Sequence, residues 1–306
     1  MLTVIVTRNP NTNILYKNII AIKNITNSKI LIIDNASSID LSKIRKLCDY
    51  FVQNNTNEGL AKAYNYAIKI ASYLNEDWIL LLDQDTEIYE NLDIQKIFDE
   101  YNKLPIMGKV AIISLNRIYA HTTKNEIGNF KLCKSVVNSG SILNVKICSR
   151  FRYNEDLFID RIDNDYCSRL RKNGFYILVY RYQLIYHSIG DYSRLYNKQI
   201  SKIIIFLLKI LSIRHGIREF KKVMHYRAFY VVYNNYYRYY TIIRNTVYLC
   251  SRGKIDLFYL KTLPSWVLSL YEQTNLIITL KLVSLALFHG ILGDLKNDNK
   301  KLIKHF

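Results

Sequence analysis

The sequence is poor in the residues that interrupt or cross-link a fold. Only 3 prolines and 10 glycines occur among 306 residues, which excludes collagen-like repeats and long low-complexity linkers. The 5 cysteines are odd in number, lie far apart and include no Cys-x-x-Cys pair, so neither a disulfide framework nor a zinc ribbon is expected. By contrast, 50% of the residues are hydrophobic, which predicts a globular chain with a full core.

Long hydrophobic runs are scarce as well. Met1 to Thr7 lacks the basic start and the small-residue cleavage site of a secretory signal and is predicted to be a strand. The longest uncharged apolar run near the end, Leu282 to Gly293, falls short of the roughly 20 residues that span a bilayer. Extension back to Gln273 reaches that length but includes Lys281, so a membrane span there stays open.

Acidic residues are few relative to basic ones. The chain has 43 Lys and Arg against 25 Asp and Glu, a net charge of +18. Residues 197–306 contain 18 basic and 5 acidic residues, so +13 of this charge lies there. Nucleic acid, an anionic membrane face and a phosphorylated substrate would all attract such a segment, and composition does not distinguish among them.

The first half of the chain alternates strand and helix signals. Strands are predicted at Leu2–Thr7, Lys29–Ile33 and Trp78–Leu82, each too apolar to have a face in water. Buried parallel strands have this composition, and the helical stretches Ile14–Lys23 and Gly59–Leu74 fit the right-handed crossovers between them. The fold class is therefore predicted to be α/β with a parallel sheet.

Polar residues stand at the carboxyl ends of these strands, where open α/β sheets bind their ligands. They are Thr7, Asp34, Asp83 and Asp85. The last two, one residue apart after a buried strand, suit Mg²⁺ or Mn²⁺ on a diphosphate, because these hard cations take oxygen ligands from protein and substrate together. An Asp-x-Asp pair alone also fits a solvated turn, and that alternative stays open.

Later segments predict more of the sheet and then a change of architecture. Further strands are expected at Val110–Ser114, Val136–Leu143 and Phe175–Tyr180, with a helix near Ile162–Lys172. From Gln199 onward the pattern is that of long helices. We therefore expect one domain over residues 1–196 and a basic, aromatic-rich helical segment over residues 197–306.

Acidic and apolar residues alternate between Asn154 and Cys167. A carboxylate in such partly buried surroundings has a raised pKa and can act as a general base on a hydroxyl. The alternative is an acidic helix start, in which Asp160 and Asp163 favour the helix N-terminus and pair with basic residues one turn later.

Ordered motifs through the first 250 residues carry a family resemblance. The first set comprises Val4-Ile5-Val6-Thr7 with Asn9-Pro10, Ile32-Ile33-Asp34-Asn35-Ala36-Ser37, Asn57-Glu58-Gly59-Leu60-Ala61 and Leu81-Leu82-Asp83-Gln84-Asp85. Their order and spacing resemble inverting family 2 glycosyltransferases with the GT-A fold. A second set looks like the rhamnosyltransferase branch: Asn138-Ser139-Gly140-Ser141, Phe158 to Asp163, Arg169 to Gly174, His187-Ser188-Ile189-Gly190, Arg238-Tyr239-Tyr240 and Arg244-Asn245.

The resemblance implies a role for each matching residue. Thr7 and Asp34 would hold the pyrimidine base of the donor, and Asn57 would line the same pocket. Asp83 would face the ribose and the sugar, while Asp85 would bind the metal and His187 would be a further metal ligand, although a lone histidine is otherwise more often structural. Asp163 matches the catalytic base of the family. Asp160 is the second choice, because two acids three residues apart lie on one face of a helix.

The implied reaction is a single displacement with inversion at the anomeric carbon. The donor would be a nucleoside diphosphate sugar, with thymidine-diphosphate-rhamnose as the leading candidate and a galactofuranosyl or other hexosyl donor as the alternative. The acceptor would be a hydroxyl of a glycan or of a lipid-linked sugar, as in the biosynthesis of cell-surface polysaccharides. No Ser-His-Asp or Cys-His constellation suggests a covalent intermediate.

The basic C-terminal segment predicts attachment to an anionic membrane surface. Ser201–Ile213 has a wide apolar face with a narrow basic stripe, and His225–Leu249 mixes three arginines with eight tyrosines. We therefore expect a cytoplasmic enzyme, peripheral at the cytoplasmic face of the membrane. Two alternatives are helices that only close the catalytic domain and a surface that stacks bases. Nucleic acid is not the expected partner, because the predicted carboxylates would repel a phosphate backbone.

Overall fold

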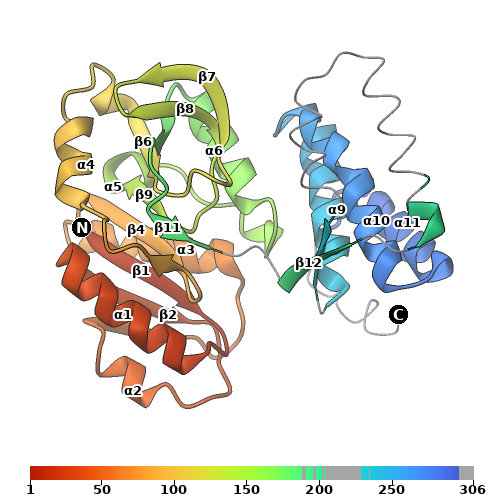
Figure 1. Cartoon of the computed structure of the whole chain (residues 1–306), viewed down its shortest axis with the longest axis horizontal. Coiled ribbons are helices and arrows are strands. Elements are labelled where there is room, and N and C mark those ends of the chain that lie inside the picture. The colour runs from red at the N-terminus through yellow and green to blue at the C-terminus, as the bar shows by residue number, and fades with distance from the viewer. Residues whose placement is uncertain (188–190, 196–197, 202, 204–228, 234, 296–306) are drawn as a thin grey trace. The chain divides into compact units, whose positions relative to one another are not determined.

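A computed structural model describes the chain except for residues 188–190, 196–197, 202, 204–228, 234 and 296–306. The chain divides into two compact units, Met1–Ser188 and Ile189–Phe306 (Figure 1). Each unit has its own elements and its own interior, and each is described by itself.

The first unit is built on a nine-stranded sheet with the order β3-β2-β1-β4-β9-β6-β10-β8-β7. Its first four strands are parallel: β3 (Tyr50–Gln53), β2 (Lys29–Asp34), β1 (Leu2–Thr7) and β4 (Trp78–Asp83). Within β1 every residue is buried, as expected for a strand covered on both faces. The register aligns Thr7 with Asp34 and Val6 with Asp83, so the carboxyl ends of these strands lie at one edge of the sheet.

The other half of the sheet is mixed. β9 (Ser141–Asn144) runs antiparallel to both of its neighbours, β4 and β6 (Val110–Ser114). β10 (Tyr176–Tyr180) is parallel to β6, and the hairpin of β7 (His121–Ile127) and β8 (Phe130–Ser135) completes this side. Because β9 is antiparallel to β4, the turn that precedes β9 lies beside the carboxyl end of β4.

Helices cover both faces of the sheet. On one face α1 (Thr12–Thr26) contributes Leu15, Ile19 and Ile22 to a core that includes Ile5, Ile32 and Leu80 of the strands. On the opposite face α3 (Leu60–Tyr73) contacts β1, β2 and β4 through small residues, mainly alanines. The remaining helices of this unit are α2 (Ser42–Arg45), α4 (Ile94–Tyr101), α5 (Val145–Cys148), α6 (Ile162–Lys172) and the 3₁₀ turns Met107–Lys109 and Glu155–Leu157.

The predicted α/β class and its main elements are confirmed, with one error in the second half. The expected strand Val136–Leu143 is wrong over most of its length, because β9 begins only at Ser141. The preceding residues form a turn that ends at Gly140, whose φ of 81° interrupts an extended strand. The β7–β8 hairpin was not predicted.

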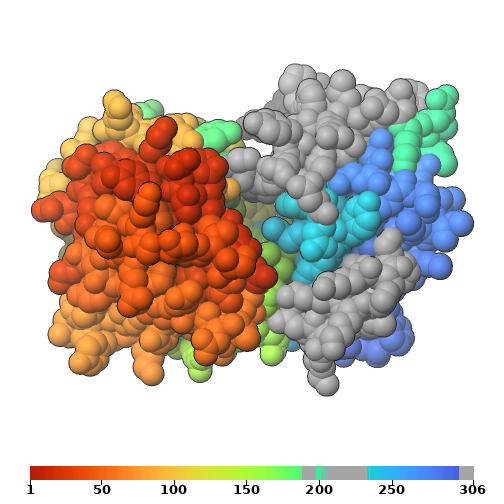
Figure 2. All heavy atoms as spheres, turned by 90° about the horizontal axis from the view of Figure 1, so that it is seen from below, coloured from red at the N-terminus to blue at the C-terminus, as the bar shows by residue number. Residues whose placement is uncertain are grey.

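The second unit is mainly helical. It contains the antiparallel pair β12 (Asp191–Leu195) and β13 (Phe229–Val232), α9 (Tyr237–Ser251), a 3₁₀ helix at Leu257–Thr262, α10 (Leu263–Gln273) and α11 (Leu276–Leu292). Helix α9 is buried along most of its length and packs most extensively against α11. Atoms of these helices, coloured cyan to blue, reach the surface in Figure 2.

Several tyrosines of the basic C-terminal segment lie in its interior. Tyr233, Tyr237, Tyr239 and Tyr240 are buried inside the unit, so these tyrosines do not form the interfacial belt that the sequence suggested. They pack internally, for example Tyr233 against Trp266 with ring centroids 6.0 Å apart. Most of the predicted interfacial helix Ser201–Ile213 lies outside the described residues.

The possible membrane span that extended back to Gln273 is interrupted near its start, and most of it forms one helix, α11. Helix α10 ends at Gln273, Thr274 follows outside it, and Asn275 begins α11 by accepting a hydrogen bond from the Ile278 N–H at 2.9 Å. Among the described residues, we find no helix with the length and hydropathy needed to cross a membrane.

Candidate active site

The carboxyl ends of β1 and β2 are joined by a buried carboxylate. Asp34 accepts hydrogen bonds from the Thr7 hydroxyl at 2.9 Å, the Ser37 hydroxyl at 2.5 Å and the Ser37 N–H at 2.9 Å. Thr7 and Asp34 are both fully buried. These bonds fix the loop after β2 against the end of β1. The contact of both residues with a nucleotide base stays a prediction.

A second set of hydrogen bonds connects this loop to the start of α3. The Asn35 side chain donates to the Gly59 carbonyl at 3.3 Å and accepts from the Asn54 side chain at 2.8 Å. Asn57 accepts a bond from the Gly59 N–H at 3.1 Å and is half-buried. Asn57 therefore lies near the loop that Asp34 holds, as expected of residues lining one pocket.

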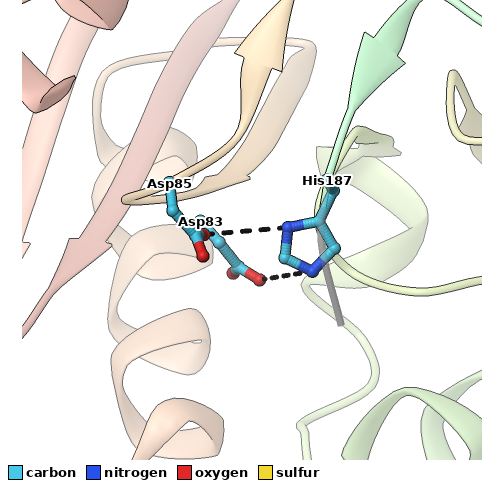
Figure 3. Close-up of side chains that lie close together, drawn as sticks. All are labelled: Asp83, Asp85 and His187. Carbon is cyan, nitrogen blue, oxygen red and sulfur yellow. Dashed lines mark ion pairs between the residues drawn. The ribbon is translucent and has the colours of Figure 1, made fainter. Parts of the chain in front are cut away.

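Asp83, Asp85 and His187 meet at the carboxyl end of β4 (Figure 3). The Nε2 atom of His187 lies 3.4 Å from Oδ2 of Asp83, and its Nδ1 atom lies 3.7 Å from Oδ1 of Asp85. Strand pairing explains this long-range contact. β5 (Glu87–Ile88) begins two residues after Asp85 and pairs antiparallel with β11 (Ile185–Tyr186), which ends just before His187.

Two hydroxyl groups hold this cluster in place. The Ser139 hydroxyl accepts from the Asp83 N–H at 3.1 Å and lies 2.5 Å from the Thr86 hydroxyl, which in turn is 3.2 Å from Nδ1 of His187. Ser139 comes from the turn before β9 and Thr86 from the turn after β4, and both are buried. The histidine ring therefore has a defined position relative to both carboxylates.

Tyr64 of α3 contacts the acidic cluster and lies within electrostatic range of Asp163. Its hydroxyl donates to Oδ1 of Asp83 at 3.4 Å. Burial raises the pKa of Tyr64 well above its ordinary value, and the charges of Asp83 and Asp163 raise it further. The phenol therefore remains protonated at neutral pH and can act only as a donor toward Asp83.

Asp163 is a half-buried carboxyl group in the first turn of α6. Burial raises its pKa from 3.8 to about 6, and the charge of Asp160 adds to this effect. The Asn164 N–H, which donates to Asp163 at 2.8 Å, and the charge of Arg161 oppose the rise. A carboxylate with a pKa near the working pH is well suited to accept a proton from a hydroxyl.

Asp160 does not share a helix face with Asp163, so the argument from three-residue spacing is wrong. Helix α6 begins at Ile162, and both Asp160 and Arg161 have left-handed backbones with φ of 64° and 62°. Phe158 also has a positive φ, of 21°. Such backbone conformations cost non-glycine residues free energy, and these residues adopt them only where the surrounding structure enforces them.

Helix α3 holds the segment that leads into this turn. The Asn65 side chain accepts from the Tyr153 N–H at 2.7 Å and donates to the Tyr153 carbonyl at 3.0 Å. The Leu60 N–H donates to the Phe158 carbonyl at 3.1 Å. The same helix therefore contacts the Asn57 loop, the acidic cluster through Tyr64, and the approach to Asp163.

The Asp83–Asp85–His187 cluster has a donor set that fits a divalent cation. One ligand atom from each residue can be chosen so that all lie within 4.8 Å of one another. Asp83 is half-buried and Asp85 is exposed, which leaves room for substrate oxygens to complete the coordination. Two carboxylates suit Mg²⁺ or Mn²⁺, and the imidazole is a better ligand for the softer Mn²⁺ than for Mg²⁺.

Sequence reasoning gave no role to several residues of this site. Ser139 stands in the motif Asn138-Ser139-Gly140-Ser141, which carried the resemblance but no function. Thr86 and Tyr64 had no sequence signal at all. Their roles follow from the turn before β9 and from the position of α3, and neither can be read from local spacing.

The fold and site define a class of protein. A sheet edge with a carboxylate and imidazole cluster that can hold a divalent cation, together with a half-buried carboxyl group of raised pKa in the same unit, suits an enzyme that binds its ligand at this edge and accepts a proton from it. Residues 3–158, about half of the chain, match the sequence model of glycosyl transferase family 2, and the chain therefore belongs to this family.

One curated relative indicates a type of glycosyltransferase within the family. The chain is 27% identical over 212 residues to a dTDP-rhamnosyl transferase, RfbF, of Shigella flexneri. The match covers 62% of this chain and 69% of the relative. The expected family 2 glycosyltransferase of rhamnosyltransferase-like type, with a GT-A-like fold, is confirmed.

Proposed function

We propose that this enzyme transfers rhamnose from thymidine-diphosphate-rhamnose to a hydroxyl of a glycan or lipid-linked acceptor, with inversion of configuration. The observation that carries the proposal is Asp163, a half-buried carboxyl group with a pKa of about 6. Asp163 and Asp83 both lie within electrostatic range of Tyr64. The similarity to a dTDP-rhamnosyl transferase supports the choice of donor. The enzyme alternative is a galactofuranosyl or other hexosyl donor.

Asp163 is the base in this proposal. The acceptor oxygen forms a bond to the anomeric carbon while the bond from that carbon to the diphosphate oxygen breaks. The proton of the acceptor hydroxyl passes to Asp163, and the nucleoside diphosphate leaves with the bonding electron pair. A single displacement of this kind inverts the anomeric centre and needs no covalent enzyme intermediate.

The donor would lie along the carboxyl ends of β1, β2 and β4. Thr7, Asp34 and Asn57 are proposed to form the base pocket, and Asp83 to face the ribose and sugar. Asp85 and His187 are proposed to hold Mg²⁺ or Mn²⁺, which would neutralise charge on the diphosphate. The 2.8 Å hydrogen bond from the Arg8 N–H to Gln84 ties the end of β1 to this site and supports a continuous donor-binding edge.

The test of the site is the Asp85→Ala variant. Asp85 is exposed at a strand end, so its removal should leave the fold intact while Mn²⁺ no longer strengthens nucleotide binding. Binding of thymidine diphosphate would be measured by calorimetry with and without Mn²⁺, with Glu90→Ala, an exposed acidic residue in the turn after β5, as the matched control. If the Asp85→Ala variant retains the full effect of Mn²⁺, the metal assignment is wrong.

A donor screen separates the candidate sugars and bases. A ligand that binds only the folded state raises the melting temperature by mass action. Thymidine and uridine diphosphate sugars would be compared by thermal shift with Mn²⁺ present. A larger shift with uridine-diphosphate-galactofuranose would replace rhamnose by the alternative donor.

We also propose that the second unit attaches the enzyme to an anionic membrane surface, as a peripheral protein. The net charge of +13 over residues 197–306 supports this. The non-enzyme alternative, a nucleic-acid-binding protein, lacks support because the chain belongs to a glycosyltransferase family.

A further inference from the structure

Helix α11 has large apolar side chains on opposite faces, and among the described residues only one of these faces is packed. Leu282 and Ala286 are fully buried within the helical unit, and Thr279, His289 and Gly290 lie on the same side. The opposite side exposes seven large apolar side chains, each between 37% and 66% exposed: Leu276, Ile277, Leu280, Leu287, Phe288, Ile291 and Leu292. We call these seven residues the α11 face.

The α11 face forms one continuous strip. At about 100° of rotation per residue, its positions fall within an arc of roughly 160° on the helix. Only Lys281 and Ser284 interrupt the apolar residues on this arc, and the helix contains no acidic residue. Soluble monomers rarely expose apolar patches larger than a few hundred Å², and larger ones mark sites of interaction.

The helix is suited to lie along a membrane rather than to cross it. Its 17 residues extend roughly 26 Å at 1.5 Å per residue, less than the roughly 30 Å of a bilayer core. A packed face against α9 and an exposed apolar face on the other side are the features of a helix that lies in the plane of the interface.

Cations stand at the C-terminal end of the same face. Arg252 donates to the carbonyls of Gly290 at 3.3 Å and Ile291 at 3.2 Å, so its guanidinium lies against the last turn of α11. Arg252 and Lys254 both lie over the ring of Tyr248, at 4.4 and 4.9 Å from its centroid. A tyrosine with two neighbouring cations is typical of the level of the lipid headgroups.

We propose that the α11 face docks onto an anionic lipid bilayer, with Lys281 and Arg252 at the level of the headgroups. The inference rests on the proposed membrane association and assigns a surface to it. Charge favours a bilayer over a second copy of the chain as the partner. A twofold contact centred on this face would bring the Lys281 side chains of the two copies toward each other, and their positive charges would repel. Anionic headgroups complement the same charges.

The experiment compares two neutral double variants of the full-length chain. Leu280→Gln with Phe288→Gln removes apolar surface from the α11 face without changing the charge. Tyr73→Gln with Ile118→Gln is the matched control, because both residues are strongly exposed in the first unit. Each protein is sedimented with vesicles of phosphatidylethanolamine and phosphatidylglycerol in a 3:1 ratio, and with phosphatidylcholine vesicles.

The α11 face variant should lose about tenfold or more in partition coefficient on the anionic vesicles, while the control stays within about twofold of the wild type. Melting temperature and donor binding are measured on all proteins, so that misfolding is recognised. If the wild type binds no anionic vesicles, the proposed membrane association itself fails.

If the wild type binds and the α11 face variant binds equally well, only the assignment of this surface is overturned. Light scattering measures the oligomeric state and tests whether the α11 face joins two copies of the chain. A wild-type dimer that becomes a monomer in the α11 face variant, with unchanged vesicle binding, would show that this face joins two copies of the chain instead.

Discussion

Asp163 combines two properties that a general base needs. It lies in the first turn of α6, where the helix dipole favours a negative charge, yet burial raises its pKa from 3.8 to about 6. Burial is the larger effect. The group is therefore mostly ionised at neutral pH and still basic enough to accept a proton as the acceptor oxygen attacks.

The Asp163→Asn variant should lower turnover by about 10²-fold or more, with little change in donor affinity. In the wild type, turnover should rise with pH and reach half of its plateau at about pH 6, because only the ionised carboxylate accepts the proton. Steady-state kinetics between pH 5 and pH 8 measure both effects. An inactive Asp160→Asn variant beside an active Asp163→Asn variant would move the base to Asp160.

The same substitution should stabilise the protein at high pH. Asp163 binds its proton more tightly in the folded state than in the unfolded state, so its contribution to stability falls as the pH rises from about 3.8 to 6 and is fully lost above 6. The shift of about two units corresponds to at most about 3 kcal/mol, and partial exposure reduces it to about 1–2 kcal/mol.

Urea unfolding of Asp163→Asn and wild type would be compared at pH 8 and pH 4.5. The variant should be the more stable protein at pH 8, and the difference should shrink at pH 4.5. Equal stability at pH 8 would show that Asp163 has an ordinary pKa.

At the scale of elements, α3 connects the loop of Asn57 to the segment that leads to Asp163, the proposed base. Its first turn meets Phe158 through the Leu60 N–H, and one turn further on Asn65 bonds both backbone groups of Tyr153. The left-handed residues Asp160 and Arg161 begin two residues after Phe158. The position of Asp163 therefore depends on how closely α3 approaches this segment.

Gly59 sets that approach, and its replacement by alanine tests it. A Cβ atom at Gly59 would stand 2.8 Å from the Phe158 carbonyl oxygen and 2.6 Å from its ring, and the φ of 87° adds strain. Gly59→Ala should cost about 2–4 kcal/mol of folding free energy and lower turnover.

Gly174→Ala is the control for this variant. Its φ of 81° imposes a similar backbone strain, but nothing lies within 4 Å of its added Cβ. It should cost only about 1 kcal/mol and leave turnover unchanged. Equal losses of stability and activity in both variants would remove the contact with Phe158 as the cause.

Sequence patterns predicted the strands that are buried on both faces and the amphipathic helix. Leu2–Thr7, Val110–Ser114 and Ile162–Lys172 match the structure residue for residue, because buried strands and an amphipathic helix have distinct periods. The strand β7, His121–Ile127, was missed because most of its residues are polar and partly or fully exposed. Its partner β8 is positioned by pairing with β10, which no local pattern reports.

The candidate site was predicted only in part, for a related reason. Asp83 and Asp85 follow a buried strand and could be found from local sequence. The contact between Asp85 and His187 depends on the pairing of β5 with β11, two strands of only two residues each. Such short strands have no detectable period, so family resemblance alone pointed to His187.

At the scale of the whole molecule, positive charge and exposed apolar surface occur together in the second unit. Residues 197–306 hold +13 of the net +18, and the α11 face lies in the same part of the chain. Coulomb attraction acts at a distance and is screened by salt, whereas apolar burial acts on contact and is not screened. Attachment to a membrane should therefore have two separable components.

Raising the salt concentration from 0.15 M to 1 M should lower binding to anionic vesicles by about fivefold or more without abolishing it. The screening length falls from about 8 Å to about 3 Å over this range, while the apolar component persists. Sedimentation at several NaCl concentrations measures the effect, and phosphatidylcholine vesicles should show almost no dependence on salt. Complete release at 1 M would mean that charge alone attaches the protein.

His187 lies far from Asp83 and Asp85 in the sequence and meets them where β11 pairs with β5. A cation bound by the three residues would hold these two short strands together in addition to their backbone pairing. By thermodynamic reciprocity, whatever stabilises the pairing of β5 with β11 would tighten the binding of the cation by the same free energy. Cation binding and the folding of this part of the chain would then be one linked equilibrium.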